Sequence, residues 1–274
     1  MKKYLKGFIK LTAYVSAFAA FTAGFAFIAE RIDEIKNYGK ELCHKPYGIY
    51  ERFVKRPLDC FLSTGALIVF SPILVVTALL VKTKLGSPVL FTQDRPGKDE
   101  KIFKLYKFRT MTDERDENGN LMPDSVRLTK FGKALRATSL DELPELINIV
   151  KGDMAVVGPR PQLVRDMVFM TPEQRRRHSV RQGLTGLAQI NGRNDIRWED
   201  KLSYDVKYID EGITFKGDVK IILGTVMKVF KSEGITDGDM ATAMDLGDYL
   251  LYSDAITQNE YEEKQIEAIK LIER

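Results

Sequence analysis

Residues 57–81 read PLDCFLSTGALIVFSPILVVTALLV, and this apolar run decides the fold that we expect. Asp59 is the only charged residue in it. A helix of about 20 apolar residues is long enough to cross a bilayer. Length and composition therefore predict that this stretch is a membrane helix.

A break in the middle of this helix is predicted by Ser71-Pro72. Proline removes one backbone hydrogen bond and kinks a helix. Lys55 and Arg56 precede the run and Lys82 and Lys84 follow it, so both ends are positively charged. Because basic flanks favour the cytoplasmic side, the pattern indicates a re-entrant helix with both ends on that side. A kinked helix that crosses the bilayer completely is the alternative.

A second apolar stretch covers residues 8–29, where Lys10 is the only interruption. Its large apolar residues recur every three or four positions, as on one helix face, and Ala13, Ala17, Ala20 and Gly24 form a seam of small residues. We expect an additional N-terminal apolar helix here, followed by a charged linker over residues 30–52. A cleaved signal peptide is the competing interpretation.

The composition of the 274 residues is that of a folded protein, with 29% charged and 44% apolar residues. A net charge of +4 gives no reason to expect a nucleic acid partner. Cys43 and Cys60 provide no disulfide framework, and Cys60 is expected to be a small buried apolar residue. Zinc is disfavoured because His44 and His178 lie far apart without cysteine partners, and no phosphate-binding glycine loop of the common types is present.

From residue 87 onward the pattern is that of a soluble domain. Strands are predicted over 89–92 and 102–108, joined by a turn at residues 96–98, and a short buried strand over 154–157. Helices are predicted over about 127–137, from the region of residue 142 to 150, over 172–182, around Trp198, and over 218–231. The run Arg175-Arg176-Arg177 is expected to be a solvated face, and the last forty residues a helical tail.

Asp141 and Glu142 are the candidate catalytic dyad of this domain. Ser139 followed by Glu142 is a capping-box pattern, which places the dyad in the first turn of a helix. Pro144 offers another possibility, because proline prefers the first helical position and would leave the dyad on the loop ahead. A structural cap is a sufficient explanation of these residues when they are considered alone.

Phosphate chemistry is the reaction class that the remaining residues suit best. Gly158-Pro159-Arg160-Pro161 fixes one arginine between two prolines, and several lysines and arginines accompany the carboxylates. Carboxylates bind magnesium, cations bind phosphoryl oxygens, and a carboxylate can attack phosphorus directly. Because a membrane helix is predicted, we also expect that one substrate is a lipid.

Several motifs, taken together, resemble a known family from about Tyr50 to Thr236. The matching stretches are Lys55-Arg56-Pro57-Leu58-Asp59, Ser71-Pro72, residues 91–97, residues 106–111, residues 139–144, residues 151–154, residues 158–161, residues 183–189, residues 192–194 and residues 218–220. Their order and spacing are similar to those of the bacterial sugar transferases, specifically the small monotopic phosphoglycosyl transferases. The ends of the chain depart from the short family members.

The resemblance implies an α+β fold that is mainly helical: a membrane-associated domain with a broken re-entrant helix and a small β-hairpin. Four segments follow from it: an N-terminal apolar helix and linker (1–49), the re-entrant membrane helix (50–86), a cytoplasmic catalytic domain (87–236) and a helical tail (237–274). The expected location is the bacterial inner membrane, with the catalytic domain facing the cytoplasm.

The resemblance also implies an enzyme of the sugar-1-phosphate transferase class (EC 2.7.8 type). Asp141 would attack a UDP-sugar, release UMP and carry the phosphosugar, which undecaprenyl phosphate then accepts, so that glycan assembly begins. Glu142 would hold Mg²⁺ together with Asp141 or position the dyad. Expected partners are a UDP-sugar, undecaprenyl phosphate, membrane lipid and downstream glycosyl transferases. A glycosyl transferase that releases UDP, or a scaffold without catalysis, is the alternative.

Five further residues match family positions for phosphate binding or active-site structure: Lys107, Arg136, Arg160, Arg193 and Asp218. Arg160 and Arg193 are the strongest of these, because loops rather than helix faces present them. Lys107 has the alternative role of a strand-edge charge, and Asp218 that of a helix cap.

Overall fold

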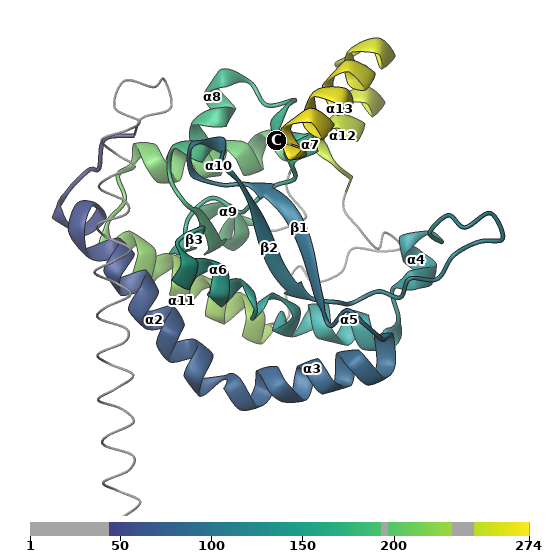
Figure 1. The fold of residues 1–274 in the computed structure, drawn as a ribbon. Helices are drawn as coiled ribbons and strands as arrows, with labels where there is room; N and C mark the ends of the chain where they lie inside the picture. Colours follow the sequence, from purple (N-terminus) through teal and green to yellow (C-terminus); the bar gives the residue numbers. More distant parts are fainter. Residues whose placement is uncertain (1–43, 193–196, 232–243, 274) are drawn as a thin grey trace, which may run out of the picture.

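A bent pair of helices underlies a mainly helical domain with two small sheets (Figure 1). The computed structural model describes residues 44–192, 197–231 and 244–273. The predicted apolar helix at 8–29 lies outside the described residues, as does Arg193. The mainly helical class with a small β-hairpin is confirmed.

The bent pair consists of a π-helical turn η1 (Tyr50–Val54), α2 (Lys55–Val69) and α3 (Ser71–Leu85). Its two arms meet at 64° across Phe70, directly before the predicted Ser71-Pro72 break. Ser71 donates from Oγ to the carbonyl oxygen of Ile68 at 2.8 Å. In the part of the chain that the structure describes, no helix taken singly has the length and apolar composition of a membrane span, whereas this bent pair has both.

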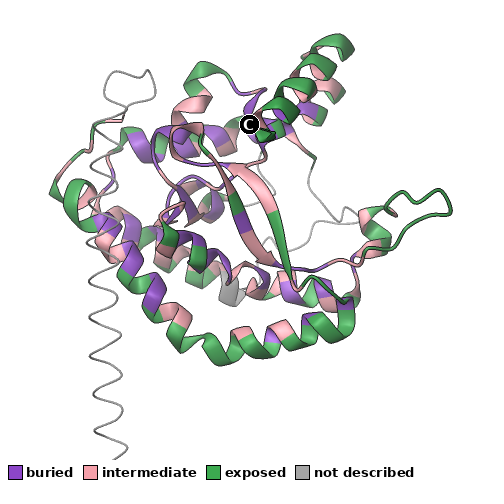
Figure 2. Cartoon of the chain, in the orientation of Figure 1, coloured by how far each residue is buried: buried purple, intermediate pink, exposed green. Residues whose placement is uncertain are grey.

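The outer surface of the bent pair is apolar and exposed, along the arc that faces away from the domain (Figure 2). Its exposed apolar side chains are Phe61, Leu62, Ile68, Val69, Phe70, Ile73, Val75, Val76, Leu79 and Leu80. The inner surface is buried: Cys60 and Val81 are fully inaccessible, and Val81 packs with Leu85, Phe108 and Leu135. The pair therefore has one side covered by the domain and one large apolar side without a protein partner among the described residues.

The hairpin consists of β1 (Leu90–Pro96) and β2 (Ile102–Phe108), which pair antiparallel from Leu90↔Phe108 to Pro96↔Ile102. The first strand extends four residues beyond the predicted end at residue 92. The polar residues 93–95, which extend it, are only partly buried, so pairing leaves them in contact with solvent. A 3₁₀ turn, η2 (Lys98–Glu100), connects the strands.

The predicted helix at 127–137 is divided into α4 (Asp124–Arg127) and α5 (Lys130–Ala137). Leu128 is extended and bridges to Met111, which interrupts the helix. Thr129 then caps α5 by accepting a hydrogen bond from the Gly132 amide at 3.1 Å. A cap of this kind satisfies one of the free amide groups at a helix start.

A parallel pair of strands, the second of which was not predicted, lies within the domain. β3 (Met154–Val157), which has the predicted bounds, pairs with β4 (Gln182–Thr185). The connection after β3 contains α7 (Val164–Met167) and α8 (Pro172–Arg175), and α9 (Leu187–Asn191) follows β4. A Cβ atom on Gly183 would lie 2.1 Å from the Gly158 nitrogen, so the close approach of the two chains requires glycine there.

The predicted basic helix at 172–182 is wrong after Arg175. The chain continues as a 3₁₀ turn, η4 (Arg176–Ser179), and then becomes extended. The expectation of a solvated face also fails for Arg177, whose side chain is fully buried, whereas Arg176 is partly exposed. The 3₁₀ turn rotates neighbouring side chains to different sides, so one arginine enters the core and the next stays at the surface.

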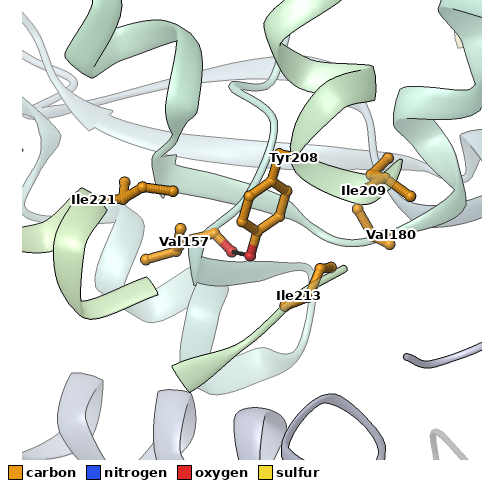
Figure 3. Close-up of a cluster of buried hydrophobic side chains, with 6 residues drawn as sticks. All are labelled: Val157, Val180, Tyr208, Ile209, Ile213 and Ile221. Carbon is orange, nitrogen blue, oxygen red and sulfur yellow. Dashed lines mark hydrogen bonds between the residues drawn. The ribbon is translucent and has the colours of Figure 1, made fainter. Parts of the chain in front are cut away.

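The remaining helices complete the domain. They are η3 (Leu140–Glu142), α6 (Glu145–Lys151), α10 (Trp198–Asp210), α11 (Phe215–Lys231), α12 (Leu246–Tyr252) and α13 (Gln258–Ile272). Figure 3 shows the buried cluster in which Tyr208 lies among aliphatic side chains and donates to the Val157 carbonyl at 3.4 Å. The helical tail is docked on the domain, since Ala268 and Leu271 pack against α7.

Candidate active site

The dyad lies on η3, a single 3₁₀ turn between α5 and α6. Ser139 adopts a left-handed conformation (φ 54°) and makes no capping hydrogen bond with its side chain, so the capping box is not formed. Pro144 occupies the N-cap position of α6. The observed arrangement is closer to the second prediction, since the carboxylates precede the longer helix. They lie on their own 3₁₀ turn rather than on a loop, and Pro144 is the N-cap rather than the first helical residue.

Glu142 is held by two cations at one carboxylate oxygen. Its Oε1 accepts from Lys107 Nζ at 3.0 Å and from Arg160 Nη2 at 2.5 Å. Burial alone would raise the pKa of this carboxyl, but Arg160 and Lys107 outweigh it and hold the pKa well below the usual value. Glu142 is consequently a fixed anion at neutral pH.

Asp141 has the opposite electrostatic environment. Its side chain is buried, and burial together with the charge of Glu142 raises its pKa to about 6. Lys107, Arg136 and Arg160 oppose the shift through their positive charges. The pKa values of these two adjacent carboxyl groups are shifted in opposite directions, so the two groups can have different chemical roles.

Glu145 is a third carboxylate at this site, and the sequence analysis did not single it out. It lies 3.1 Å from Lys107 Nζ and is 2% exposed. Burial, assisted by the charge of Glu142, raises its pKa to about 7. Its position three residues after Glu142 indicates a shared site, because residues three apart on a helical turn lie on the same side.

The predicted phosphate-binding residues divide into two groups. Lys107 (on β2), Arg136 (on α5) and Arg160 (on the loop after β3) converge on the dyad. Arg136 also donates from Nε to Thr110 Oγ1 at 3.1 Å. These three cations come from separate elements, so only the tertiary structure collects them.

Asp218 lies in a different cluster, between the bent helix pair and α11. Its carboxylate accepts from Lys55 at 2.5 Å, from Tyr50 at 2.7 Å and from Tyr208 at 2.8 Å. It is buried in the first turn of α11, and these contacts, rather than a helix cap, account for its carboxylate. The side chain thus fastens α2 to the domain.

The dyad also meets the requirements for Mg²⁺. Mg²⁺ is commonly bound through one or two carboxylates together with substrate phosphates. Among the described residues, both hydrogen bonds of the Glu142 carboxylate reach Oε1, which leaves Oε2 for another ligand. No group of three or more histidine, cysteine or acidic residues suited to a metal occurs in the same part of the chain. The donor set fits an ion shared with a diphosphate.

Known proteins share most of this sequence. The sequence model of a family described as "Bacterial sugar transferase" matches residues 50–232. The chain is 52% identical over 190 residues to the uncharacterized sugar transferase EpsL of Bacillus subtilis, a match that covers 69% of this chain and 94% of EpsL. The matched region contains both the bent helix pair and the dyad.

Two further relatives have names that state a reaction. The chain is 44% identical over 186 residues to the UDP-glucose:undecaprenyl-phosphate glucose-1-phosphate transferase of Klebsiella pneumoniae, which covers 64% of this chain and 40% of that protein. It is 34% identical over 197 residues to an Aeromonas hydrophila UDP-N-acetylgalactosamine-undecaprenyl-phosphate N-acetylgalactosaminephosphotransferase, with coverage of 69% and 46%. The chain spans less than half the length of these two relatives.

Proposed function

We propose, because this chain belongs to the bacterial sugar transferase family, that it transfers a sugar 1-phosphate from a UDP-sugar to undecaprenyl phosphate and so initiates glycan assembly. The names of the Klebsiella and Aeromonas relatives describe transfers of this kind. The observation that carries the proposal is the pair of adjacent carboxylates, Asp141 and Glu142, in opposite electrostatic environments among three cations.

Asp141 is the nucleophile in this proposal. Glu142 is a weak nucleophile, because Lys107 and Arg160 occupy its Oε1 and lower its pKa. Asp141 has a pKa raised to about 6, which makes its carboxylate more basic, yet at pH 7 it is mostly ionised. A buried carboxylate with these properties combines nucleophilicity with the required charge state.

The reaction has two steps at the same phosphorus atom. An Asp141 carboxylate oxygen forms a bond to the β-phosphorus of the UDP-sugar, and the bond from that phosphorus to the oxygen shared with the α-phosphate breaks. UMP leaves with the electron pair. An oxygen of undecaprenyl phosphate then bonds to the same phosphorus and releases Asp141, which gives a polyprenyl diphosphate sugar.

The surrounding residues serve this transfer by binding and orienting charge. Lys107, Arg136 and Arg160 bind phosphoryl oxygens, whose charge increases as the leaving bond lengthens. Asp141 and Glu142 would hold Mg²⁺, which supplies neutralising charge to the diphosphate when it is bound. Arg193, outside the described residues, is proposed as a further phosphate contact from sequence alone.

The bent helix pair is proposed to enter one leaflet of the inner membrane and return, with the catalytic domain on the cytoplasmic side. Two features support it: the 64° bend and the apolar outer surface of both arms. A re-entrant helix would hold the domain at the membrane surface, where the phosphate of undecaprenyl phosphate lies.

The test is nucleotide release from a panel of UDP-sugars with Mg²⁺ and undecaprenyl phosphate in lipid nanodiscs. We expect UMP with one or more donors, and a phosphosugar adduct on Asp141 when the lipid acceptor is omitted. Asp141→Asn should release no UMP and form no adduct, whereas Asp94→Asn, a partly exposed carboxylate paired with Lys104, should behave as the unmodified chain. UDP as the released nucleotide would indicate a glycosyl transferase, and full function of Asp141→Asn in cells would indicate a scaffold.

A further inference from the structure

We infer that the buried ion pair between Arg177 and Asp205 is a positioning device that holds Arg160 on Glu142. This inference rests on the proposed function, because it concerns the same site. Neither residue belongs to the dyad or to the cations that surround it. They act through the backbone of Arg160, so they are positioning residues.

The pair is buried and tightly bonded. Arg177, on η4, has a side chain that is 0% exposed, and that of Asp205, on α10, is 1% exposed. Arg177 donates from Nε at 3.0 Å and from Nη2 at 2.7 Å to the same oxygen, Asp205 Oδ2. The free energy needed to remove two charges from water is about as large as the free energy gained from their attraction. An ion pair in the core is therefore poor evidence for added stability. A role in orientation explains why this position carries one.

One nitrogen of Arg177 links this pair to the active site. Besides Asp205, Arg177 Nη2 donates to the backbone carbonyl oxygen of Arg160. The Arg160 guanidinium in turn donates to Glu142 at 2.5 Å. A continuous series of contacts therefore runs from α10 through Arg177 and the Arg160 backbone to the dyad.

A second arginine, which is partly buried, holds the neighbouring carbonyl. Arg95, on β1, donates from Nη1 to the Pro161 carbonyl oxygen at 3.2 Å. The preceding residues of the same loop are fixed by β4, since the Gly158 amide donates to Thr185 at 2.9 Å and the Gly183 amide donates to Pro159 at 2.8 Å. Each residue of the Gly158–Pro161 loop thus has its own backbone anchor, and that of Arg160 is Arg177.

An exposed pair beside the buried one provides a matched control. Arg176 and Asp210 join the same two elements, η4 and α10, but their side chains are 41% and 49% exposed. Exposed ion pairs contribute little, because water and salt screen them. Variants of this exposed pair show how the loss of any contact between η4 and α10 affects activity.

Asp205→Asn and Arg177→Lys test the role of the pair. Lysine keeps the positive charge but cannot donate to Asp205 and to the Arg160 carbonyl in the geometry of a guanidinium. We expect each variant to lower kcat/KM about 100-fold, since a displacement of about 1 Å in a catalytic group can have that effect. Asp210→Asn should stay within about twofold of the unmodified chain.

A double variant separates positioning from folding. Arg177→Met combined with Asp205→Leu replaces the ion pair by apolar residues, a change that often preserves stability. We expect it to unfold at nearly the temperature of the unmodified chain and yet to show the same rate loss. Unchanged activity in this double variant would overturn the inference, whether or not Asp205→Asn folds.

Arg160 itself provides the decisive comparison. If Asp205 acts through Arg160, Asp205→Asn should lower the rate about 100-fold in the unmodified chain but less than about threefold in an Arg160→Lys background. Equal losses in both backgrounds would contradict the inference.

A readout that does not depend on turnover distinguishes failure of this inference from failure of the proposed function. In nanodiscs, the ¹⁵N-labelled Nη–H groups of Arg160, of which Nη2 donates to Glu142, should exchange slowly with solvent. Their signals are assigned with Arg160→Lys, and the protection should be lost in Asp205→Asn. Protection that is equal in both overturns the positioning role. Absence of UMP release from the unmodified chain, with this protection intact, overturns only the proposed reaction.

Discussion

Lys55 Nζ donates to Asp218 Oδ2 at 2.5 Å, a buried contact between residues 163 positions apart. It fastens the start of the bent helix pair to α11, and Tyr50 and Tyr208 donate to the same carboxylate. Asp218 thus joins the start of the bent pair to α10 and α11 through three donors. Its contacts are those of a structural residue.

Replacing Asp218 by Asn should therefore destabilise the fold more than it changes catalysis. Lys55 would lose its closest anion and retain the more distant Asp59, at 3.9 Å. Breaking a buried ion pair costs about 3–5 kcal/mol, and we expect the lower end of that range. Tyr50→Phe, the milder control, should cost about 1 kcal/mol for one hydrogen bond. Thermal unfolding in nanodiscs measures both. A raised KM for the UDP-sugar with unchanged unfolding temperature would instead assign Asp218 to phosphate binding.

Lys107→Met should lower kcat/KM about 100-fold, the usual effect of removing one preorganised donor from an active site. Lys107 lies between Glu142 and Glu145, at 3.0 and 3.1 Å. Its loss removes a positive charge that balances the negative charges of both carboxylates. Lys104→Met is the matched control on the same strand, because Lys104 is 65% exposed and pairs with Asp94 at the surface. Steady-state UMP release compares the two. Equal effects would make Lys107 a strand-edge charge without a special role.

His178 should make the fold sensitive to mild acid. Its ring is fully buried, and burial together with the charges of Arg177 and Arg175 lowers its pKa well below 6.5, while the Gly97 backbone partly opposes this. Below pH 6.5 His178 binds a proton in the unfolded chain but not in the folded chain, so the free energy of unfolding falls as the pH falls. From pH 7 to pH 5 this single group should remove about 2 kcal/mol.

His178→Asn isolates this contribution from that of the carboxylates. Urea unfolding of both chains at pH 8, 7, 6 and 5 gives the difference in unfolding free energy at each pH. At pH 8 neither state of the unmodified chain is protonated at His178, so the difference there is the baseline. The pH effect is confirmed if the variant gains on the unmodified chain as the pH falls, and it is refuted if the difference stays constant.

Cysteine labelling tests the re-entrant topology. In a chain with Cys43 and Cys60 replaced by Ser, Arg52→Cys and Thr83→Cys mark the two ends of the bent pair at exposed positions. A membrane-impermeant maleimide should label both from the cytoplasmic side of inverted vesicles. Val69→Cys, near the bend, should resist labelling because lipid covers it. Labelling of the two ends from opposite sides would show a complete crossing.

Much of this architecture could be predicted from the sequence because its causes are local. The helix break before Pro72 follows from a missing amide hydrogen, and β3 from four apolar residues after a glycine turn. The sequence and its family resemblance also indicate Asp141, Glu142, Lys107 and Arg160 as site residues. The structure places them together.

Other features could not be read from local patterns. β4 is a strand only because Gly183 allows it to approach the loop after β3, and the basic stretch 172–182 is not one helix because Arg177 reaches Asp205 in the core. Glu145 became part of the site when Lys107 was brought to it from β2. In each case the deciding partner lies far along the chain.

The sequence by itself determined the chemistry that the chain carries and where its helices must bend, since residue types and backbone constraints are properties of short segments. The tertiary structure alone decided which carboxylate is a fixed anion and which is basic. That difference arises from burial and from charges that separate elements bring within a few ångströms, and no short segment contains either.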